Sequence, residues 1–288
     1  YTVEPKKLSN LSSVQEAISE YVQTDPALEF EVNSETGEML LSGAGELHVE
    51  ISVEKLLRVG VEIQLGTPMV LLKEQMAKDG EIVSTTDTTA SRFKVQARIA
   101  VSEEEMTTIG TIIDSNIQSN CYLVDASNKI DPIGDETQWI RQAFRTVVQR
   151  GPLQGEKLRK TMIIIKEASI KCDSPETAWL DITQPLVTVI RQSIMSGKPA
   201  ILEPWIKLEL ISPEEHVGVL SSILARRRGD ISEINSERSL YKIVAEIPVR
   251  ESFGLANEIR TETSGWVTWG AKTGGYREIK QIEEEEEY

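Results

Sequence analysis

The order of helix and strand patterns at the two ends of this chain limits its fold more than any other feature. In residues 1–67, apolar residues recur at helical spacing over 10–24 and 43–60, with short alternating stretches around them. If Tyr1–Glu4 is a first strand, the order is β-α-β-β-α-β, which is typical of a ferredoxin-like domain. The other strands are expected at 27–33, 39–41 and 61–65.

Residues 203–288 repeat this order. Ser212-Pro213-Glu214-Glu215 is a strong helix start, since it combines a capping residue, a first-turn proline and acids near the positive helix end. We expect this helix to run to Arg228, with Gly229 as its left-handed cap. Strands are expected at 205–211, 230–235, 240–248 and 265–271, with a second helix at 251–263.

The middle of the chain, residues 68–202, has a different pattern. It predicts a long exposed loop over 78–91 and a second loop over 171–181. We therefore expect a separate α/β domain between two ferredoxin-like ones. Its strands are expected at 70–75, 92–101 and 158–170, and its helices from Ser102, at 135–150 and at 182–196.

Charge and composition exclude several classes of protein. Lys and Arg number 31 against 46 Asp and Glu, and the net charge of −15 argues against a non-specific nucleic-acid binder, although local basic patches stay possible. Part of the excess is the run Glu283–Glu287, which we expect to be a solvated acidic tail. No apolar run approaches 18 residues, so we expect no membrane helix.

The few cysteines and histidines point to a chain without a metal site. The two cysteines and two histidines do not stand at metal-ligand spacing, and two cysteines fit a reducing, cytoplasmic setting. Because the first residue is not Met, we expect a fragment or a processed product.

No catalytic constellation is visible in the sequence. Gly197-Lys198 is followed by proline and lacks the earlier glycine of a phosphate-binding loop. Asn128-Lys129-Ile130-Asp131 has the form of a guanine-reading motif, but without a phosphate cradle it is interpreted as a chance match. Neither Gly-x-Ser-x-Gly nor His-Glu-x-x-His occurs, so we assign no catalytic residue and leave open whether the intact protein is an enzyme.

Three stretches carry a family resemblance. Leu41–Glu50 (LSGAGELHVE) resembles the domain III signature of elongation factors 2 and G. Gly151-Pro152-Leu153 and Lys198–Pro204 resemble domain IV and its exit, and the features from Ser212 to Gly254 resemble domain V. The amino-acid sequence of these stretches is more similar to the archaeal and eukaryotic branch of the family than to the bacterial branch. The resemblance implies ferredoxin-like domains at 1–67 and 203–288, flanking a domain at 68–202 with a left-handed βαβ crossover.

The resemblance also implies a role. Members of this family bind the ribosome, and domain IV enters the site that a transfer RNA vacates. The implied partners are ribosomal RNA and ribosomal proteins, with no membrane, for a cytoplasmic monomer. GTP and magnesium would bind only through an upstream GTPase domain that this sequence lacks, and no cofactor is expected in the chain itself.

The presumed tip of domain IV departs from the family. The family's modified histidine and adjacent arginine have no counterpart in 171–181, which carries Asp173, Glu176 and Asp181 instead. Trp179 either stacks on a base or packs at a helix start. The departure favours a non-translocating paralogue that acts in ribosome recycling, dormancy or quality control. A scaffold in another ribonucleoprotein is a further alternative.

Other candidate residues have two interpretations each. Arg226, Arg227 and Arg228 either contact RNA phosphates or complement the negative helix end. His216, on the same helix, is either a surface contact or a plain exposed residue. Three residues that begin the second helix of domain III either form an interdomain contact or allow tight packing of helix on sheet; these are Gly43, Gly45 and Glu46.

Overall fold

The structure is a computed structural model that describes residues 1–6, 11–26, 28–32, 37–43, 46–66, 68–86, 88–172, 174–237 and 239–279. These residues form two compact units. Unit 1 contains Tyr1–Leu71 and Glu203–Arg277, and unit 2 contains Leu72–Leu202 with the chain from Glu278. The tail at 283–287 lies outside the described residues, and the predicted boundaries at 67 and 202 stay predictions.

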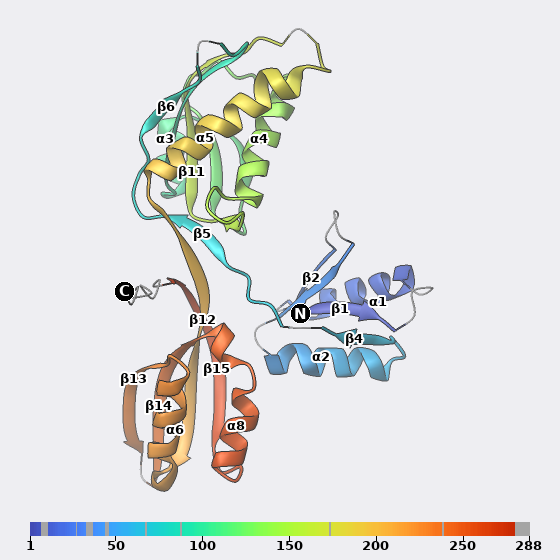
Figure 1. The fold of residues 1–288 in the computed structure, drawn as a ribbon, viewed down its shortest axis with the longest axis vertical. Helices are drawn as coiled ribbons and strands as arrows, with labels where there is room; N and C mark the ends of the chain where they lie inside the picture. Colours follow the sequence, from blue (N-terminus) through green and yellow to red (C-terminus); the bar gives the residue numbers. More distant parts are fainter. Residues whose placement is uncertain are drawn as a thin grey trace, which may run out of the picture. The chain divides into compact units, whose positions relative to one another are not determined.

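The N-terminal domain of unit 1 has the predicted β-α-β-β-α-β order (Figure 1). Its antiparallel sheet has the strand order β2-β3-β1-β4. The buried side chains of Ile18, Leu41 and Leu56 show why the helical and alternating patterns meet in one core. The elements are β1 Thr2–Pro5, α1 Leu11–Thr24, β2 Glu29–Val32, β3 Met39–Ser42, α2 Glu46–Arg58 and β4 Ile63–Leu65.

The C-terminal domain of unit 1 repeats the topology. Its sheet runs β15-β12-β14-β13, so in both domains the first strand lies between the third and the fourth. The prediction of two ferredoxin-like domains is therefore confirmed. The elements are β12 Pro199–Pro213, α6 Glu214–Arg226, β13 Asp230–Glu237, β14 Leu240–Pro248, α7 Val249–Ser252, α8 Leu255–Glu262 and β15 Thr268–Glu278.

Three predictions for this domain need correction. The helix expected at 251–263 is two helices, because Gly254 adopts a left-handed φ of +71° between them. The last strand starts at Thr268 rather than 265, since Ser264 and Gly265 are both left-handed. The strand expected at 205–211 belongs to β12, whose first residues pair with β5 and whose later residues pair with β14.

Unit 2 is built around a five-stranded mixed sheet with the order β6-β7-β11-β9-β8. Its central strand β11 is buried on both faces: Ile163 and Ile165 face the α4–α5 core, whereas Met162 and Ile164 face α3. The elements are β5 Lys73–Met76, β6 Ile82–Ser84, β7 Arg92–Ile99, α3 Glu103–Ile109, β8 Thr111–Asn116, β9 Cys121–Asp125, α4 Thr137–Gln149, β10 Lys157–Leu158, β11 Thr161–Ser169, the π-helix η2 Trp179–Thr183 and α5 Gln184–Ser196.

Two predictions for unit 2 need correction. The loop expected at 78–91 contains the short edge strand β6, and the strand expected at 158–170 is broken where Lys160 has a φ of +48°. The parallel neighbours β9 and β11 are joined through α4, as a βαβ crossover requires. The left hand of this crossover stays a prediction.

Candidate functional site

The arginine run at the end of α6 lies on a helix-terminal turn that differs from the prediction. Arg228, not Gly229, takes the left-handed conformation, with a φ of +57°. The Gly229 amide donates to Leu224 O at 2.8 Å and the Arg228 amide donates to Ala225 O at 3.2 Å, which is the Schellman pattern. Gly229 is needed for space, because a Cβ there would lie 2.6 Å from Leu224 O.

All three guanidinium groups of this run have carboxylate partners inside the domain. Arg226 and Arg227 share Glu258, whose Oε2 accepts from Arg227 Nε at 2.7 Å. Arg228 Nη2 lies 2.6 Å from Oε1 of Glu203, whose side chain is only 4% exposed. Arg226 stays 68% exposed. The geometry therefore leaves Arg226 as the member of the run most accessible to a partner.

Glu258 is held in its charged form by this arrangement. Burial raises the pKa of its carboxyl, but the hydrogen bonds and positive charges of Arg227 and Arg226 outweigh that effect. The net result is a pKa below the ordinary glutamate value. Arg227 also donates to Glu251 O and Phe253 O, so it ties the end of α6 to the α7–α8 connection.

His216 is the third residue of α6 and is less accessible than either interpretation required. Its side chain is only 16% exposed. Nε2 lies 3.5 Å from Glu215 Oε1, a distance that allows weak ion pairing but not a well-formed hydrogen bond. Whether His216 contacts RNA stays a prediction.

Two of the three candidates at the start of α2 have defined contacts. A Cβ on Gly43 would lie 2.8 Å from Val49 Cγ2 and 3.2 Å from Leu28 Cδ2, so close packing of helix on sheet requires the glycine. Glu46 Oε2 accepts a 2.7 Å hydrogen bond from the amide of Gly254 in the second ferredoxin-like domain of unit 1. Gly45 lies outside the described residues.

The tip of unit 2 presents apolar and acidic side chains. Trp179, the first residue of η2, is 42% exposed and Leu180 is 62% exposed. Whether Trp179 stacks on a base stays a prediction. Both residues lie on η2, a π-helical segment of the kind often found at functional sites. Glu176 is exposed, whereas Asp173 lies outside the described residues.

The guanine-reading sequence form is a structural turn. Asp125, which is buried, accepts hydrogen bonds from the Ser127 hydroxyl and from the backbone amides of Ser127 and Ile130. Asp131 accepts from the Ile133 amide at 3.0 Å, so its carboxylate is already engaged. This geometry agrees with a chance match.

Glu74 on β5 is fully buried in unit 2, and no sequence pattern predicted its role. Its carboxylate accepts backbone hydrogen bonds from Leu153, Gln154 and Glu156 at 2.9–3.1 Å. Burial and the nearby Glu74 charge raise the pKa of Glu156. In the sequence, only the glycine of Gly151-Pro152-Leu153 indicates that another group lies close to the backbone at this point.

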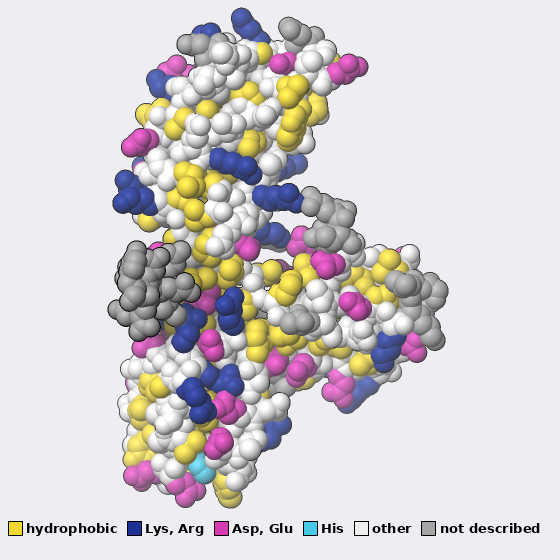
Figure 2. All heavy atoms as spheres, viewed as in Figure 1, with side chains coloured by type: hydrophobic (Ala, Val, Ile, Leu, Met, Phe, Trp, Pro, Cys, Tyr) yellow, Lys and Arg dark blue, Asp and Glu magenta, His cyan; other side chains and the backbone are white. Residues whose placement is uncertain are grey.

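Charge is distributed unevenly along the chain. Residues 1–67 contain four Lys and Arg against twelve Asp and Glu, a net charge of −8, whereas residues 68–202 have a net charge of −1. Residues 203–288 have −6, of which the five glutamates at 283–287 contribute all but one. On the visible face of the C-terminal ferredoxin-like domain, basic and acidic side chains are interspersed (Figure 2). The body of this domain is therefore nearly neutral.

The described residues contain neither a membrane-spanning helix nor a cluster of metal-ligand side chains. Within the described ranges, no helix has the length and apolar character to cross a membrane. The same residues contain no group of three or more His, Cys, Asp or Glu arranged to hold a metal ion. Cys121 and Cys172 are both free thiols, and burial raises the pKa of Cys121.

Comparisons with known proteins agree with the fold. Residues 1–67 match the family model described as Elongation Factor G, domain III, and residues 200–286 match Elongation factor G C-terminus. A crystal structure of a Thermus thermophilus protein superposes with a TM-score of 0.64 at 23% identity, covering 97% of this chain and 40% of that one. At this identity the likeness supports the fold alone.

Curated relatives extend the match across the middle domain. Elongation factor 2 of Metallosphaera sedula is 28% identical over 94% of this chain and 41% of its own length. Elongation factor 2 of Aeropyrum pernix is 28% identical over 96% of this chain and 42% of its own length. Elongation factor 2 of Pyrococcus furiosus is 26% identical with the same coverage. The chain thus spans about two fifths of the length of these relatives, and it belongs to the elongation factor G and elongation factor 2 family, whose C-terminal domains it comprises.

Proposed function

We propose that this chain is the ribosome-binding C-terminal module of an elongation factor 2-like translational GTPase. The observation that carries the proposal is the match of three domains, in order, to proteins named elongation factor 2 over more than nine tenths of the chain. The module acts by shape and a few contacts, in the movement of transfer RNA or in occupancy of its site. GTP and magnesium bind elsewhere in the intact factor.

Arg226 is the proposed RNA-contacting residue of the C-terminal domain. Its exposed guanidinium can donate to a phosphate while Arg227 keeps Glu258. Arg227 and Arg228 act as positioning residues, because their hydrogen bonds to Glu258, Glu203 and backbone carbonyls fix the turn that carries Arg226. A nearly neutral domain whose arginine run is largely engaged by its own carboxylates limits non-specific binding to RNA.

A second candidate function rests on the tip. The exposed Glu176, Trp179 and Leu180 stand where the family resemblance implies a histidine and an arginine. The phosphate backbone of RNA is attracted by cations. A tip that presents acidic and apolar side chains is therefore poorly suited to bind messenger or transfer RNA. A paralogue that occupies the ribosome without translocating, in recycling, dormancy or quality control, is therefore favoured over a conventional translocase.

Co-sedimentation with archaeal ribosomes across a potassium chloride series tests the proposal. The wild-type chain is expected to pellet with ribosomes at low salt and to dissociate as salt rises. Arg226→Ala is expected to weaken binding. It is also expected to reduce the slope of the logarithm of the binding constant against the logarithm of the salt concentration by about one. Arg58→Ala, which removes an equally exposed helical arginine paired with Glu54, is the matched control. A folded chain that fails to pellet at low salt contradicts the proposal.

A further inference from the structure

Three cations lie on one face of the sheet that β10, β5 and the first residues of β12 form in unit 2. Lys157 on β10 and Lys73 on β5 are register partners in a parallel pair, so their side chains lie on the same face. Arg159 follows Lys157 by two residues and donates its amide to Glu74 O at 2.9 Å, so it continues on this face. We call Lys73, Lys157 and Arg159 the basic face.

Electrostatics and exposure agree with this placement. Burial raises the pKa of the Cys121 thiol, and the charges of Lys73 and Arg159 both oppose that increase, so the two cations lie near the same side chain. Lys157 is exposed, and Lys73 and Arg159 are partly exposed. The carboxylate of Glu74 lies on the opposite face, under the 151–156 loop. The basic face is therefore in contact with solvent.

The chain leaves its last described strand beside this sheet. Ile279 N donates to Ile201 O at 3.0 Å, and Ile201 is the register partner of Glu74. Because the carbonyl of Glu74 bonds to β10, the order across the sheet is β10, β5, β12 and then Ile279. Neighbouring strands are about 4.8 Å apart, so Ile279 lies about 10 Å from β5 and about 14 Å from β10.

The five glutamates at 283–287 are within reach of the basic face, although they lie outside the described residues. An extended chain covers at most about 3.6 Å per residue, so Glu283 can lie up to about 14 Å from Ile279, and Glu287 up to about 29 Å. Three residues separate the run from Ile279, and so short a linker gives an effective concentration in the millimolar range. An intrinsic dissociation constant of about 1 mM is therefore enough for half occupancy.

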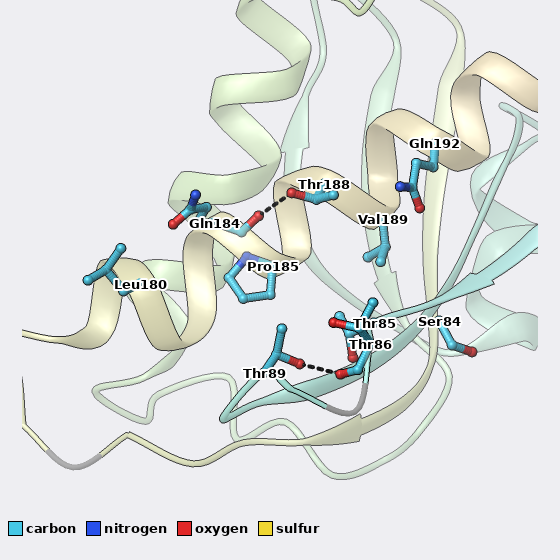
Figure 3. A pocket seen from close by; sticks show the side chains of 10 residues that line it. All are labelled: Ser84, Thr85, Thr86, Thr89, Leu180, Gln184, Pro185, Thr188, Val189 and Gln192. Carbon is cyan, nitrogen blue, oxygen red and sulfur yellow. Dashed lines mark hydrogen bonds between the residues drawn. The ribbon is translucent and has the colours of Figure 1, made fainter.

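Charge complementarity selects the basic face as the docking surface for this run. Lysine has three N–H donors and arginine five, so these side chains can bind glutamates while they keep contacts within unit 2. Unit 2 also has a groove of about 290 Å³ between α5 and the β6–β7 hairpin (Figure 3). None of the residues that line this groove is charged, so it offers a carboxylate no ion pair.

We propose that the C-terminal glutamate run, 283–287, binds the basic face of the same chain and shields its cations from other polyanions. The run crosses β12 and β5 and places carboxylates at Lys73, Lys157 and Arg159. Loss of the run's charge exposes three clustered cations to RNA phosphates, on a domain whose net charge is only −1. This docking does not depend on ribosome binding or on RNA contact by Arg226.

Paramagnetic relaxation in the isotope-labelled full chain tests the docking. Tyr288→Cys carries a nitroxide label, in a chain where Cys172→Ser has removed the partly exposed thiol. The test variant carries glutamine at each of positions 283–287, which removes the charge and keeps the length. Lys157→Glu reverses an exposed charge of the basic face, and Lys129→Glu reverses an exposed charge elsewhere in unit 2 as the matched control.

At low salt, relaxation at the amides of Lys73 and Arg159 is expected to be stronger in the glutamate chain than in the glutamine variant. The difference should vanish as salt rises, because the contacts are exposed ion pairs. Lys157→Glu should reduce the relaxation in the glutamate chain, whereas Lys129→Glu should leave it unchanged. Equal relaxation in the glutamate and glutamine chains at low salt overturns the proposal, as does a stronger effect on another surface.

Binding of a ten-nucleotide oligouridylate tests the shielding. The glutamine variant is expected to bind this probe about tenfold more tightly than the wild-type chain at low salt. Adding Lys157→Glu should remove most of that gain, whereas adding Lys129→Glu should not. Unchanged affinity in the glutamine variant overturns the shielding. Equal effects of the two lysine changes also overturn it, because the gain would then come from net charge alone.

Discussion

Glu74 and Gly151 are in such close contact that no side chain fits between them. A Cβ on Gly151 would lie 2.3 Å from Glu74 Oε2 and 2.9 Å from Glu156 O. The backbone of residues 151–156 wraps the buried carboxylate and supplies three amide donors to it. The Gly-Pro-Leu sequence of the family resemblance thus has a structural reason, which is to close a loop over a buried charge.

Gly151→Ala is expected to destabilise unit 2 by about 1–3 kcal/mol, because neither the carboxylate nor the loop backbone can move away without losing hydrogen bonds. Urea unfolding measures the loss. Gly134→Ala in the same unit is the control, since its Cβ would meet Asp131 at an ordinary 3.4 Å. Equal stability of the two variants would show that the contact is not restrictive.

Glu74→Gln is expected to loosen the 151–156 loop. One carboxylate oxygen becomes an amide group that faces backbone donors, so at least one hydrogen bond is lost at a cost of about 1–3 kcal/mol. Hydrogen exchange should speed up at the amides of Leu153, Gln154 and Glu156. Glu81→Gln, at an exposed position in the same unit, should leave these amides protected.

Arg228→Ala is expected to destabilise unit 1 by about 2–4 kcal/mol. It leaves the Glu203 carboxylate buried and unpaired, although the half-exposed guanidinium places the loss below that of a fully buried pair. Adding Glu203→Gln should recover part of the loss, which a double-mutant cycle measures. Strictly additive effects would argue against the ion pair. Arg58→Ala, in an exposed pair, should cost about 0.5 kcal/mol or less.

Glu258 predicts a pH dependence of stability. Its folded pKa is lowered, so its contribution is present above the unfolded pKa of about 4.3 and is lost as the pH falls through the folded pKa. Glu258→Gln should therefore lower the free energy of unfolding at pH 7, with a difference that shrinks as the pH falls below about 4. A difference that stays constant from pH 7 to pH 3 would contradict the assignment. Glu262→Gln, exposed on the same helix, is the control.

Local patterns predicted most of the fold. Helical spacing in 10–24 and the apolar run at 39–41 after a turn predicted α1 and β3 to within a residue or two, since these patterns depend on neighbours in sequence. Long-range contacts decided the rest. β6 forms because β7 pairs with it, and β12 continues through Pro204 because it pairs with β5 and then with β14.

The candidate site was less predictable for the same reason. The sequence singled out Arg226, Arg227 and Arg228 together. Nothing local shows that Arg227 and Arg228 are engaged by Glu258 and Glu203, which lie 31 and 25 residues away. The left-handed Arg228 departs from the usual preference for glycine, and it lies in a turn closed by two backbone hydrogen bonds.

Competition on the ribosome tests the central proposal most directly. Ribosomes from Pyrococcus furiosus are saturated with this chain, and full-length elongation factor 2 from the same organism is added in increasing amounts. Displacement of the chain, with Arg226→Ala displaced at lower concentrations than wild type, is the predicted result. Simultaneous binding of both proteins, or no binding of the folded chain at low salt, would contradict the assignment to the elongation factor site.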